Sequence, residues 1–155
     1  MHQLLLSAFQ HDVQTVATSQ TRVLSAHATA MGKALLAFSP PETVNEVIEN
    51  GLDQYTPFTI ITAHGLRRAL AIARMTRVAT TRQELRLNTA AVGVPVFAGG
   101  GQVVAAFELT MRNSGYQIHL IQSAVVVAAR SLSHEIINSH CRRQLNRSLV
   151  YLRSG

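Results

Sequence analysis

Cysteine and long apolar runs are scarce in this sequence, and each scarcity excludes a class of protein. Cys141 is the single cysteine, so the chain cannot form an internal disulfide, which is usual in a reducing compartment. Apolar runs such as residues 124–129 are far shorter than the roughly 20 residues that a membrane span requires. The first residues lack the basic region and cleavage site of a signal peptide. We therefore expect a soluble, cytoplasmic protein that does not contact a membrane.

Acidic residues are also few, and the two signs of charge are separated along the chain. Eight Asp and Glu stand against fourteen Lys and Arg, which gives a net charge of +6. Four of the acidic residues gather between 42 and 53, and ten of the basic ones lie between 67 and 86 or between 142 and 153. Such basic clusters can contact nucleic-acid phosphates, but they more often form solvated faces or oligomer contacts. The length of 155 residues and the 47% hydrophobic content predict one domain with a single core.

Hydrophobic periodicity predicts three helices in the first half of the chain. The first begins at Thr29, a capping residue, and ends near residue 39, before two prolines. The second starts at Pro41 and stops at Gly51, and the third covers residues 64–75. The first 25 residues fit a short helix followed by a strand with a turn.

The second half has β character until a last helix. Residues 78–81 and 89–97 predict strands, and Pro95 indicates an edge or a bulge. Glycines 99–101 join the second strand to another β-rich run, which is typical of a hairpin. No helix with P-loop spacing follows these glycines, so nucleotide binding is not expected. A continuous apolar stripe predicts a long helix over residues 118–149.

The residues suited to catalysis or metal binding do not form a recognisable set. The seven histidines fall on no spacing that places ligands together, and no serine lies in a nucleophile elbow. We therefore expect no enzyme activity, no metal and no cofactor.

Two other stretches favour a small-ligand site. Residues 26–37 form a run of small residues that opens into an apolar helix, whose first-turn amides could bind an acidic group. Near residue 108, strand alternation places two polar side chains on a single face, where they could either meet solvent or line a pocket. One face carries Val104, Ala106, Glu108 and Thr110, and the other carries Val103, Ala105, Phe107 and Leu109.

The order and spacing of several motifs resemble the effector-binding domain of IclR-type bacterial transcription regulators. These motifs are HATAMGKALLAF, SPPETVNEVIENGLDQYTPFTI, LRRALAIAR, QEL, VPVFAGGGQVVAAFEL and AVVVAARSLSHEI, and together they span roughly residues 12–137. The resemblance implies an α+β, GAF-like (profilin-like) domain in which helices flank an antiparallel sheet. It also implies binding of a small metabolite and connection to a winged helix-turn-helix domain, which this sequence lacks.

The resemblance divides the chain and assigns its site. Residues 1–25 would be a shortened N-terminal segment, 26–140 the effector-binding domain, and 141–155 a basic extension. The implied ligand contacts come from the helix start and from later strands: Ala30, Met31, Gly32, Thr81, Thr89, Ala91, Glu108 and Thr110. Ala91 stands where a cysteine is frequent in the family, and Glu108 where a serine is frequent. A buried glutamate would repel an anion or bind a proton, which favours a larger, partly apolar or hydroxylated effector over a simple keto acid.

Two functions from different classes follow. The first is a domain that senses a small organic effector, with carboxylic and aromatic acids as candidates, and that forms a homodimer or tetramer. It would contact DNA only through the separate winged domain. The alternative is a stand-alone nucleic-acid-binding protein that uses residues 64–88 as a helix-turn-helix. Residues 78–81 are poor turn formers, however, and the second helix would have almost no apolar face.

Overall fold

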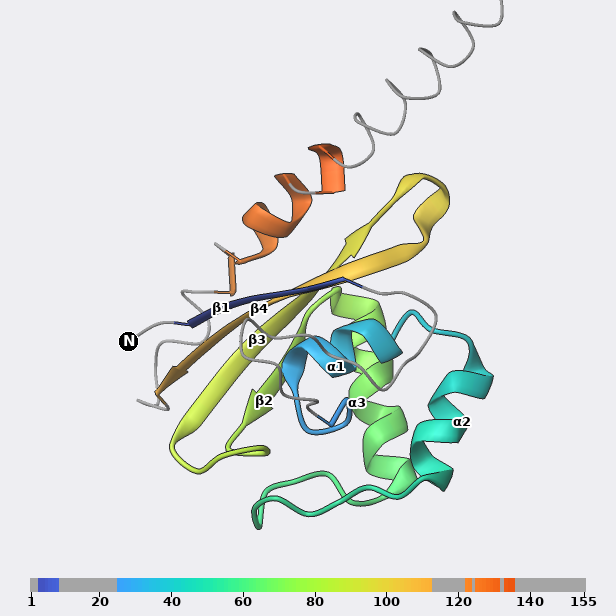
Figure 1. Cartoon of the computed structure of the whole chain (residues 1–155), viewed down its shortest axis with the longest axis vertical. Helices are drawn as coiled ribbons and strands as arrows, with labels where there is room; N and C mark the ends of the chain where they lie inside the picture. The colour runs from blue at the N-terminus through green and yellow to red at the C-terminus, as the bar shows by residue number, and fades with distance from the viewer. Residues whose placement is uncertain (1–2, 9–24, 113–121, 124, 132, 136–155) are drawn as a thin grey trace, which may run out of the picture.

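A four-stranded antiparallel sheet forms the centre of the protein, in the order β1-β4-β3-β2 (Figure 1). The computed structural model describes residues 3–8, 25–112, 122–123, 125–131 and 133–135. The strands are β1 (Gln3–Ala8), β2 (Ala79–Arg82), β3 (Thr89–Phe97) and β4 (Val103–Arg112). A 3-10 turn at Gly99–Gly101 closes the hairpin between β3 and β4, as the sequence predicts.

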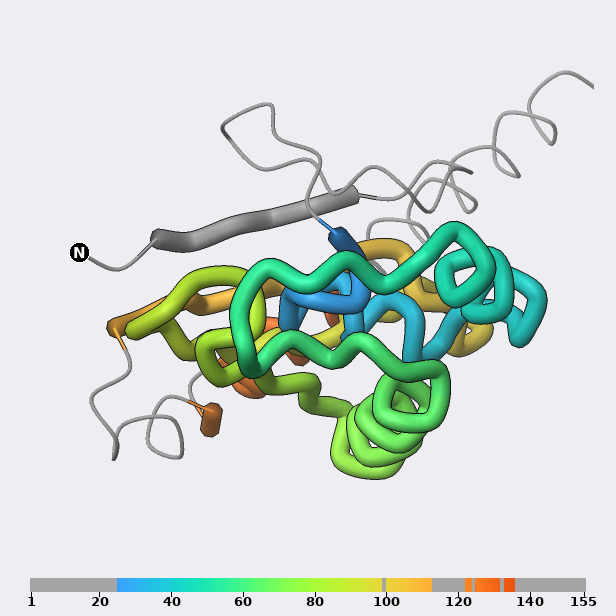
Figure 2. Tube along the Cα trace, turned by 90° about the horizontal axis from the view of Figure 1, so that it is seen from below, coloured from blue at the N-terminus to red at the C-terminus, as the bar shows by residue number. Residues whose placement is uncertain are grey.

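Three helices lie between β1 and β2 in the chain: α1 (Ala30–Leu36), α2 (Pro41–Glu49) and α3 (Ala63–Thr76). Threonine caps begin two of them. Thr29 accepts a hydrogen bond from the Gly32 amide, and Thr62 accepts one from the Gly65 amide. All three predicted helices are therefore confirmed to within a few residues. The connection between α2 and α3 passes in front of α1 in the view of Figure 2.

The two faces of the sheet carry separate apolar clusters. On one face, α1, α2 and α3 contribute Met31, Leu35, Leu36, Val44, Leu66 and Leu70, which pack with Ala79 and Ala106. On the other face lies the C-terminal helical segment, by which we mean the described residues between 122 and 135. Its Val125 and Ala129 pack on Val92, Val94, Val96 and Phe107. Both faces are thus covered by helix. No helix in the described part of the chain is long and apolar enough to cross a membrane.

Two expectations about the strands are wrong. Residues 3–8 form a strand rather than a short helix, because their backbone pairs with β4 from Gln3 opposite Thr110 to Ala8 opposite Ala105. The predicted alternation along β4 holds from residue 105 onward but fails at its start. There the register between β3 and β4 shifts at Phe97, so that Val103 packs with the α1-side cluster and Val104 with the other.

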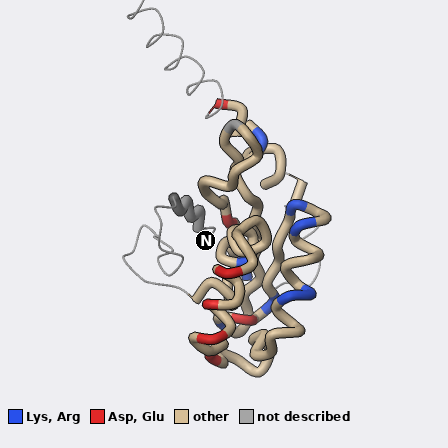
Figure 3. Tube along the Cα trace, turned by 90° about the vertical axis from the view of Figure 1, so that its right-hand side faces the viewer, with Lys and Arg blue, Asp and Glu red and all other residues tan. Residues whose placement is uncertain are grey.

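The helix-turn-helix alternative over residues 64–88 also fails. α3 ends at Thr76, and the chain continues into a strand instead of a second helix. Figure 3 shows the basic residues of α3 on a different side of the molecule from the acidic residues of α2. Two of these arginines bind neighbouring elements: Arg67 donates to Asn45 at 3.1 Å, and Arg74 donates to the Ala37 carbonyl at 2.6 Å. The predicted helix 118–149 is helical where it is described, and the rest lies outside the described residues.

Candidate functional site

The carboxylate of Glu108 lies against the first turn of α1. Its Oε2 accepts a hydrogen bond from the Met31 amide at 2.6 Å, and the Ala30 amide also donates to the carboxylate. Its Oε1 accepts a hydrogen bond from the Thr110 hydroxyl at 2.9 Å. Only 5% of Glu108 is exposed, so this side chain is a buried acid and not part of a solvated face. The structure therefore excludes the solvated interpretation for Glu108, while contact of this face with a ligand stays a prediction.

A glycine in β3 allows α1 to come this close to the sheet. Gly93 is the register partner of Glu108, and a Cβ atom built on it would lie 2.4 Å from the carbonyl carbon and oxygen of Ala30. Any side chain at this position would push the helix start away from the strand. Gly32 has a similar role, because its Cβ would lie 2.3 Å from the Ala26 carbonyl oxygen. The run of small residues thus serves close backbone packing.

Burial raises the pKa of Glu108 above its ordinary value. The hydrogen bonds from the Met31 amide, the Thr110 hydroxyl and the Ala30 amide act in the opposite direction, because they stabilise the carboxylate. The ammonium of Lys33 also favours the carboxylate through its charge. The charge of Glu108 therefore depends on the balance between its burial and these neighbouring groups.

A buried ion pair lies next to this site, and the sequence analysis missed it. The Lys33 ammonium is 2.8 Å from both carboxylate oxygens of Glu84, and Lys33 is only 2% exposed. Burial lowers the pKa of Lys33 and raises the pKa of Glu84, while each partner opposes the shift of the other. The available signal was that the single lysine of the chain lies inside an apolar helical stretch.

The segment between α2 and α3 holds Glu84 in place. The hydroxyl of Thr59 donates to the Glu84 carbonyl at 2.6 Å, and the hydroxyl of Thr56 donates to the neighbouring Gln83 carbonyl. The same segment reaches the residues before α1, because His27 Nε2 lies 3.0 Å from the Asp53 carbonyl oxygen. Glu108, Lys33 and Glu84 thus form one polar layer, which we call the acid–lysine layer. It is enclosed by elements from four parts of the chain.

The remaining predicted site residues lie on or near the same face of the sheet. Thr81 is paired with Ala91, and Ala91 with Thr110, so these three residues form a row across β2, β3 and β4. Thr81 and Ala91 are buried. Thr89 lies at the start of β3, where its hydroxyl donates to the Arg86 carbonyl at 2.7 Å. The structure therefore brings Ala30, Met31, Glu108 and Thr110 into contact, while the hydroxyl of Thr89 serves the preceding turn.

The three amides at the start of α1 are already hydrogen-bonded within the chain. Those of Ala30 and Met31 bind Glu108, and that of Gly32 binds the Thr29 hydroxyl. An anionic ligand would have to displace the Glu108 carboxylate to reach them. Contact of a ligand with these residues remains a prediction. In the described part of the chain, no three His, Cys, Asp or Glu side chains are grouped to hold a metal.

Comparison with protein families identifies the domain type. Residues 7–134 match the family model of the bacterial transcriptional regulator IclR C-terminal domain. The p-hydroxybenzoate hydroxylase transcriptional activator of Acinetobacter baylyi is 31% identical over 116 residues, which cover 74% of this chain and 43% of that protein. The HTH-type transcriptional regulator XynR of Escherichia coli is 33% identical over 94 residues, or 60% of this chain and 37% of the regulator. The chain thus spans less than half the length of these relatives, which are transcriptional regulators.

Solved structures agree with this match. The inducer binding domain of the PobR transcription factor from Acinetobacter, a double mutant in complex with 3-hydroxybenzoic acid, superimposes with a TM-score of 0.72 at 26% identity. The alignment covers 84% of this chain and 86% of that domain. The C-terminal domain of the E. coli regulator KdgR shares the fold, with a TM-score of 0.77 at 22% identity and 87% coverage of both chains. The predicted α+β, GAF-like fold is confirmed.

Proposed function

Because the chain belongs to the family of IclR C-terminal domains of bacterial transcriptional regulators, we propose that it senses a small organic effector and controls DNA binding by a regulator. The matched relatives are transcriptional regulators, so the domain is assigned no catalytic step. DNA is contacted through a separate winged helix-turn-helix domain, and the domains associate as a homodimer or tetramer in the cytoplasm. The acid–lysine layer beneath α1 is the observation that carries the effector-binding role.

The effector contacts the face of the sheet that carries Thr81, Ala91, Glu108 and Thr110, next to the start of α1. Buried titratable groups in an otherwise apolar domain are typical of functional sites, because their charges are costly unless they serve a purpose. Thr81 of β2 and Thr110 of β4 offer hydroxyls on the two strands that flank β3, and Ala91 of β3 leaves room between them. Met31 adds an adaptable apolar wall.

Glu108 determines which effectors fit. A carboxylate effector would be repelled by the Glu108 carboxylate or would require Glu108 to hold a proton. A hydroxyl group can instead donate a hydrogen bond to Glu108 without displacing its bonds to Met31 and Thr110. The effector is therefore a partly apolar compound that presents a hydroxyl group to Glu108. A hydroxylated aromatic acid can also bind if its hydroxyl points toward Glu108 and its carboxylate points away from Glu108.

Binding acts on the regulator by differential affinity. An effector shifts an equilibrium only when it binds one arrangement of the subunits more tightly than another. The acid–lysine layer is suited to this role because it joins α1, β4, the turn at Glu84 and the segment between α2 and α3. A ligand that moves Glu108 from the Met31 amide would change the contact between α1 and the sheet.

A thermal-shift experiment tests the role of Glu108. The purified chain and its Glu108→Ser variant are compared in the presence of benzyl alcohol, 4-hydroxybenzyl alcohol, benzoate and 4-hydroxybenzoate. A ligand at about 100 times its Kd stabilises the native state by about 2.7 kcal/mol, which is a measurable rise in Tm. We expect the hydroxylated compounds to raise the Tm of the natural chain more than benzoate does. In Glu108→Ser we expect the opposite order, with benzoate raising the Tm more.

Glu46→Ser is the matched control, because Glu46 is exposed on α2 and outside the layer. The result is read as the change between variants, so that a compound bound elsewhere contributes equally to both and cancels. An order of ligands that is the same in the natural chain and in Glu108→Ser would show that the effector does not contact Glu108.

A further inference from the structure

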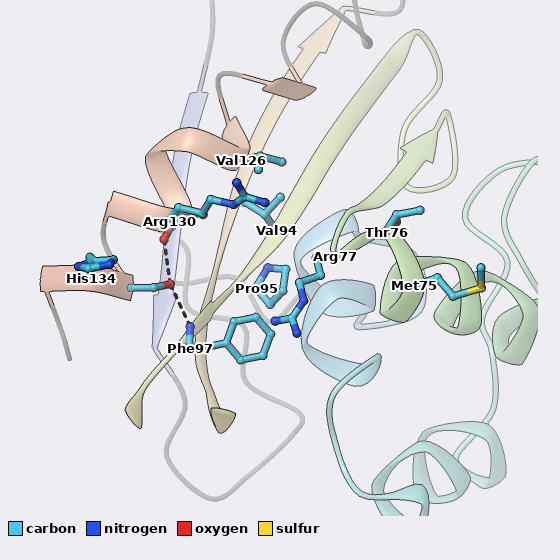
Figure 4. Close-up of a pocket in the computed structure, with 11 residues that line it drawn as sticks. Met75, Thr76, Arg77, Val94, Pro95, Phe97, Val126, Arg130 and His134 are labelled. Atoms are coloured by element: carbon cyan, nitrogen blue, oxygen red, sulfur yellow. Dashed lines mark hydrogen bonds between the residues drawn. The ribbon is translucent and has the colours of Figure 1, made fainter. Parts of the chain in front are cut away.

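A cleft of about 620 Å³ lies outside the acid–lysine layer, since Glu108, Lys33 and Glu84 do not line it. β2 begins at Ala79, opposite Gly93, so no strand of the described residues lies beside β3 from Val94 onward at this edge. The end of α3 lies on one side of the opening and the C-terminal helical segment on the other (Figure 4). The volume falls within the range of about 300–1,000 Å³ that is usual for small-molecule sites.

The floor of this cleft is apolar, and so is part of its wall. Val94, Pro95 and Phe97 of β3 form the floor, and Val126 of the C-terminal helical segment forms part of the wall. Pro95 has no amide hydrogen, which makes this edge a poor template for the addition of a further strand. The cleft is therefore better suited to a compact ligand than to an extended peptide.

Two arginines approach the cleft from opposite sides. Figure 4 shows Arg77 entering from the end of α3 and Arg130 from the C-terminal helical segment, with Val94 and Pro95 between them. The guanidinium of Arg77 lies 4.7 Å from the centre of the Phe97 ring, which stacks it against the apolar floor. None of the described residues that line the cleft is acidic. Within the described ranges, the ion pair of the chain is Lys33 with Glu84, and neither arginine takes part in one.

Hydrogen bonds fix the C-terminal helical segment to the floor of the cleft. The Phe97 amide donates to the Ser133 hydroxyl at 3.2 Å, and that hydroxyl donates to the Ala129 carbonyl at 2.9 Å. Arg77 has a left-handed backbone, with φ of 57°, which ends α3 and directs the chain into the strand that follows. The two cationic side chains therefore project from positions that the backbone determines.

We propose that this cleft is a second ligand site, distinct from the layer at Glu108, and that it binds an aryl carboxylate. The flat apolar ring would lie on Val94, Pro95 and Phe97, and the carboxylate would meet the guanidinium groups of Arg77 and Arg130. A guanidinium suits this role because it offers paired donors to a carboxylate and also packs its face on apolar groups. Because the cleft joins α3 to the C-terminal helical segment, its occupation stabilises the packing of both on β3.

The test uses 4-fluorobenzoate as the probe and follows its binding to the full chain by 19F NMR. Each guanidinium supplies a charge-assisted hydrogen bond, so we expect Arg77→Gln and Arg130→Gln each to weaken binding by about tenfold. Arg68→Gln is the control, because Arg68 is an exposed arginine of α3 outside the cleft. We expect this variant to bind like the natural chain. The uncharged isostere 4-fluorobenzamide should bind much more weakly than the carboxylate.

Binding that is unchanged in both Arg77→Gln and Arg130→Gln would overturn the proposal, as would equal affinity for the acid and the amide. Absence of binding to the natural chain at millimolar probe would overturn it too. Circular dichroism melts show whether a variant that binds the probe weakly is still folded. Binding that responds to Glu108→Ser but to neither arginine variant would instead place the probe in the layer beneath α1.

Discussion

Glu108 and Met31 are 77 residues apart in the sequence, yet the carboxylate of one accepts a hydrogen bond from the amide of the other at 2.6 Å. This bond joins the middle of β4 to the first turn of α1 across the face that the family resemblance assigns to the effector. The chain therefore places an acidic group of its own where an acidic ligand was expected.

We expect the stability of the natural chain to fall with rising pH relative to Glu108→Gln. Burial raises the pKa of Glu108, so the folded state keeps a proton that the unfolded state has released. The stabilisation is complete below the unfolded pKa of about 4.3 and is lost as the pH rises through the higher folded value. Thermal melts of both proteins from about pH 4 to pH 8 measure the difference.

Other titrating groups contribute equally to both proteins and cancel in this comparison. Glu46→Gln, which removes an exposed carboxyl of α2, should run parallel to the natural chain. If the natural chain instead gained stability over Glu108→Gln as the pH rose, the hydrogen bonds from Met31 and Thr110 would outweigh the cost of burial.

Gly93→Ala should destabilise the fold by about 1–3 kcal/mol, the usual cost of forcing a methyl group into a packed interior. The new Cβ would lie 2.4 Å from the Ala30 carbonyl and would separate α1 from β3. Gly100→Ala is the control: nothing lies within 4 Å of its Cβ, although its φ of 81° makes alanine mildly unfavourable. Urea unfolding of both variants measures the difference, and equal losses would show that the contact with Ala30 is unimportant.

Removing one partner of the buried Lys33–Glu84 ion pair should lower the stability of the fold much more than removing both partners. Lys33→Met leaves the Glu84 carboxylate buried without its cation, which costs about 3–5 kcal/mol in comparable cases. The double variant Lys33→Met with Glu84→Gln should recover most of this loss, since no charge is then left unpaired. A double-mutant cycle from urea unfolding gives the coupling. Additive effects of the two changes would mean that the pair is not coupled in the folded state.

The sequence predicts the local elements well because their signals are local. The Thr29 cap, Pro41 at the second helix start and the glycines at 99–101 each act within a few residues of their position. Period-two alternation also groups Glu108 with Thr110 correctly. It cannot tell whether that face is buried, because burial depends on α1, which is distant in the sequence.

The features that the sequence does not predict depend on contacts between residues that are far apart in the chain. Residues 3–8 have an ambiguous pattern, and only pairing with β4 makes them a strand. The Lys33–Glu84 contact spans 51 residues, and no spacing rule connects the two positions. The packing of α1 on Gly93 likewise requires the fold, although each glycine is visible in the sequence. The candidate site was therefore located by family resemblance, while its internal hydrogen bonds come from the structure alone.

The last expectation concerns DNA. If the basic residues of α3 formed a nucleic-acid surface, the chain alone would bind duplex DNA with an affinity that falls steeply with salt. We expect no such binding, because Arg67 and Arg74 are hydrogen-bonded to Asn45 and Ala37, and a strand follows the helix. Fluorescence anisotropy of a labelled random duplex at low salt makes the measurement. Binding that Arg68→Glu weakens would contradict the expectation and give α3 a direct role on DNA.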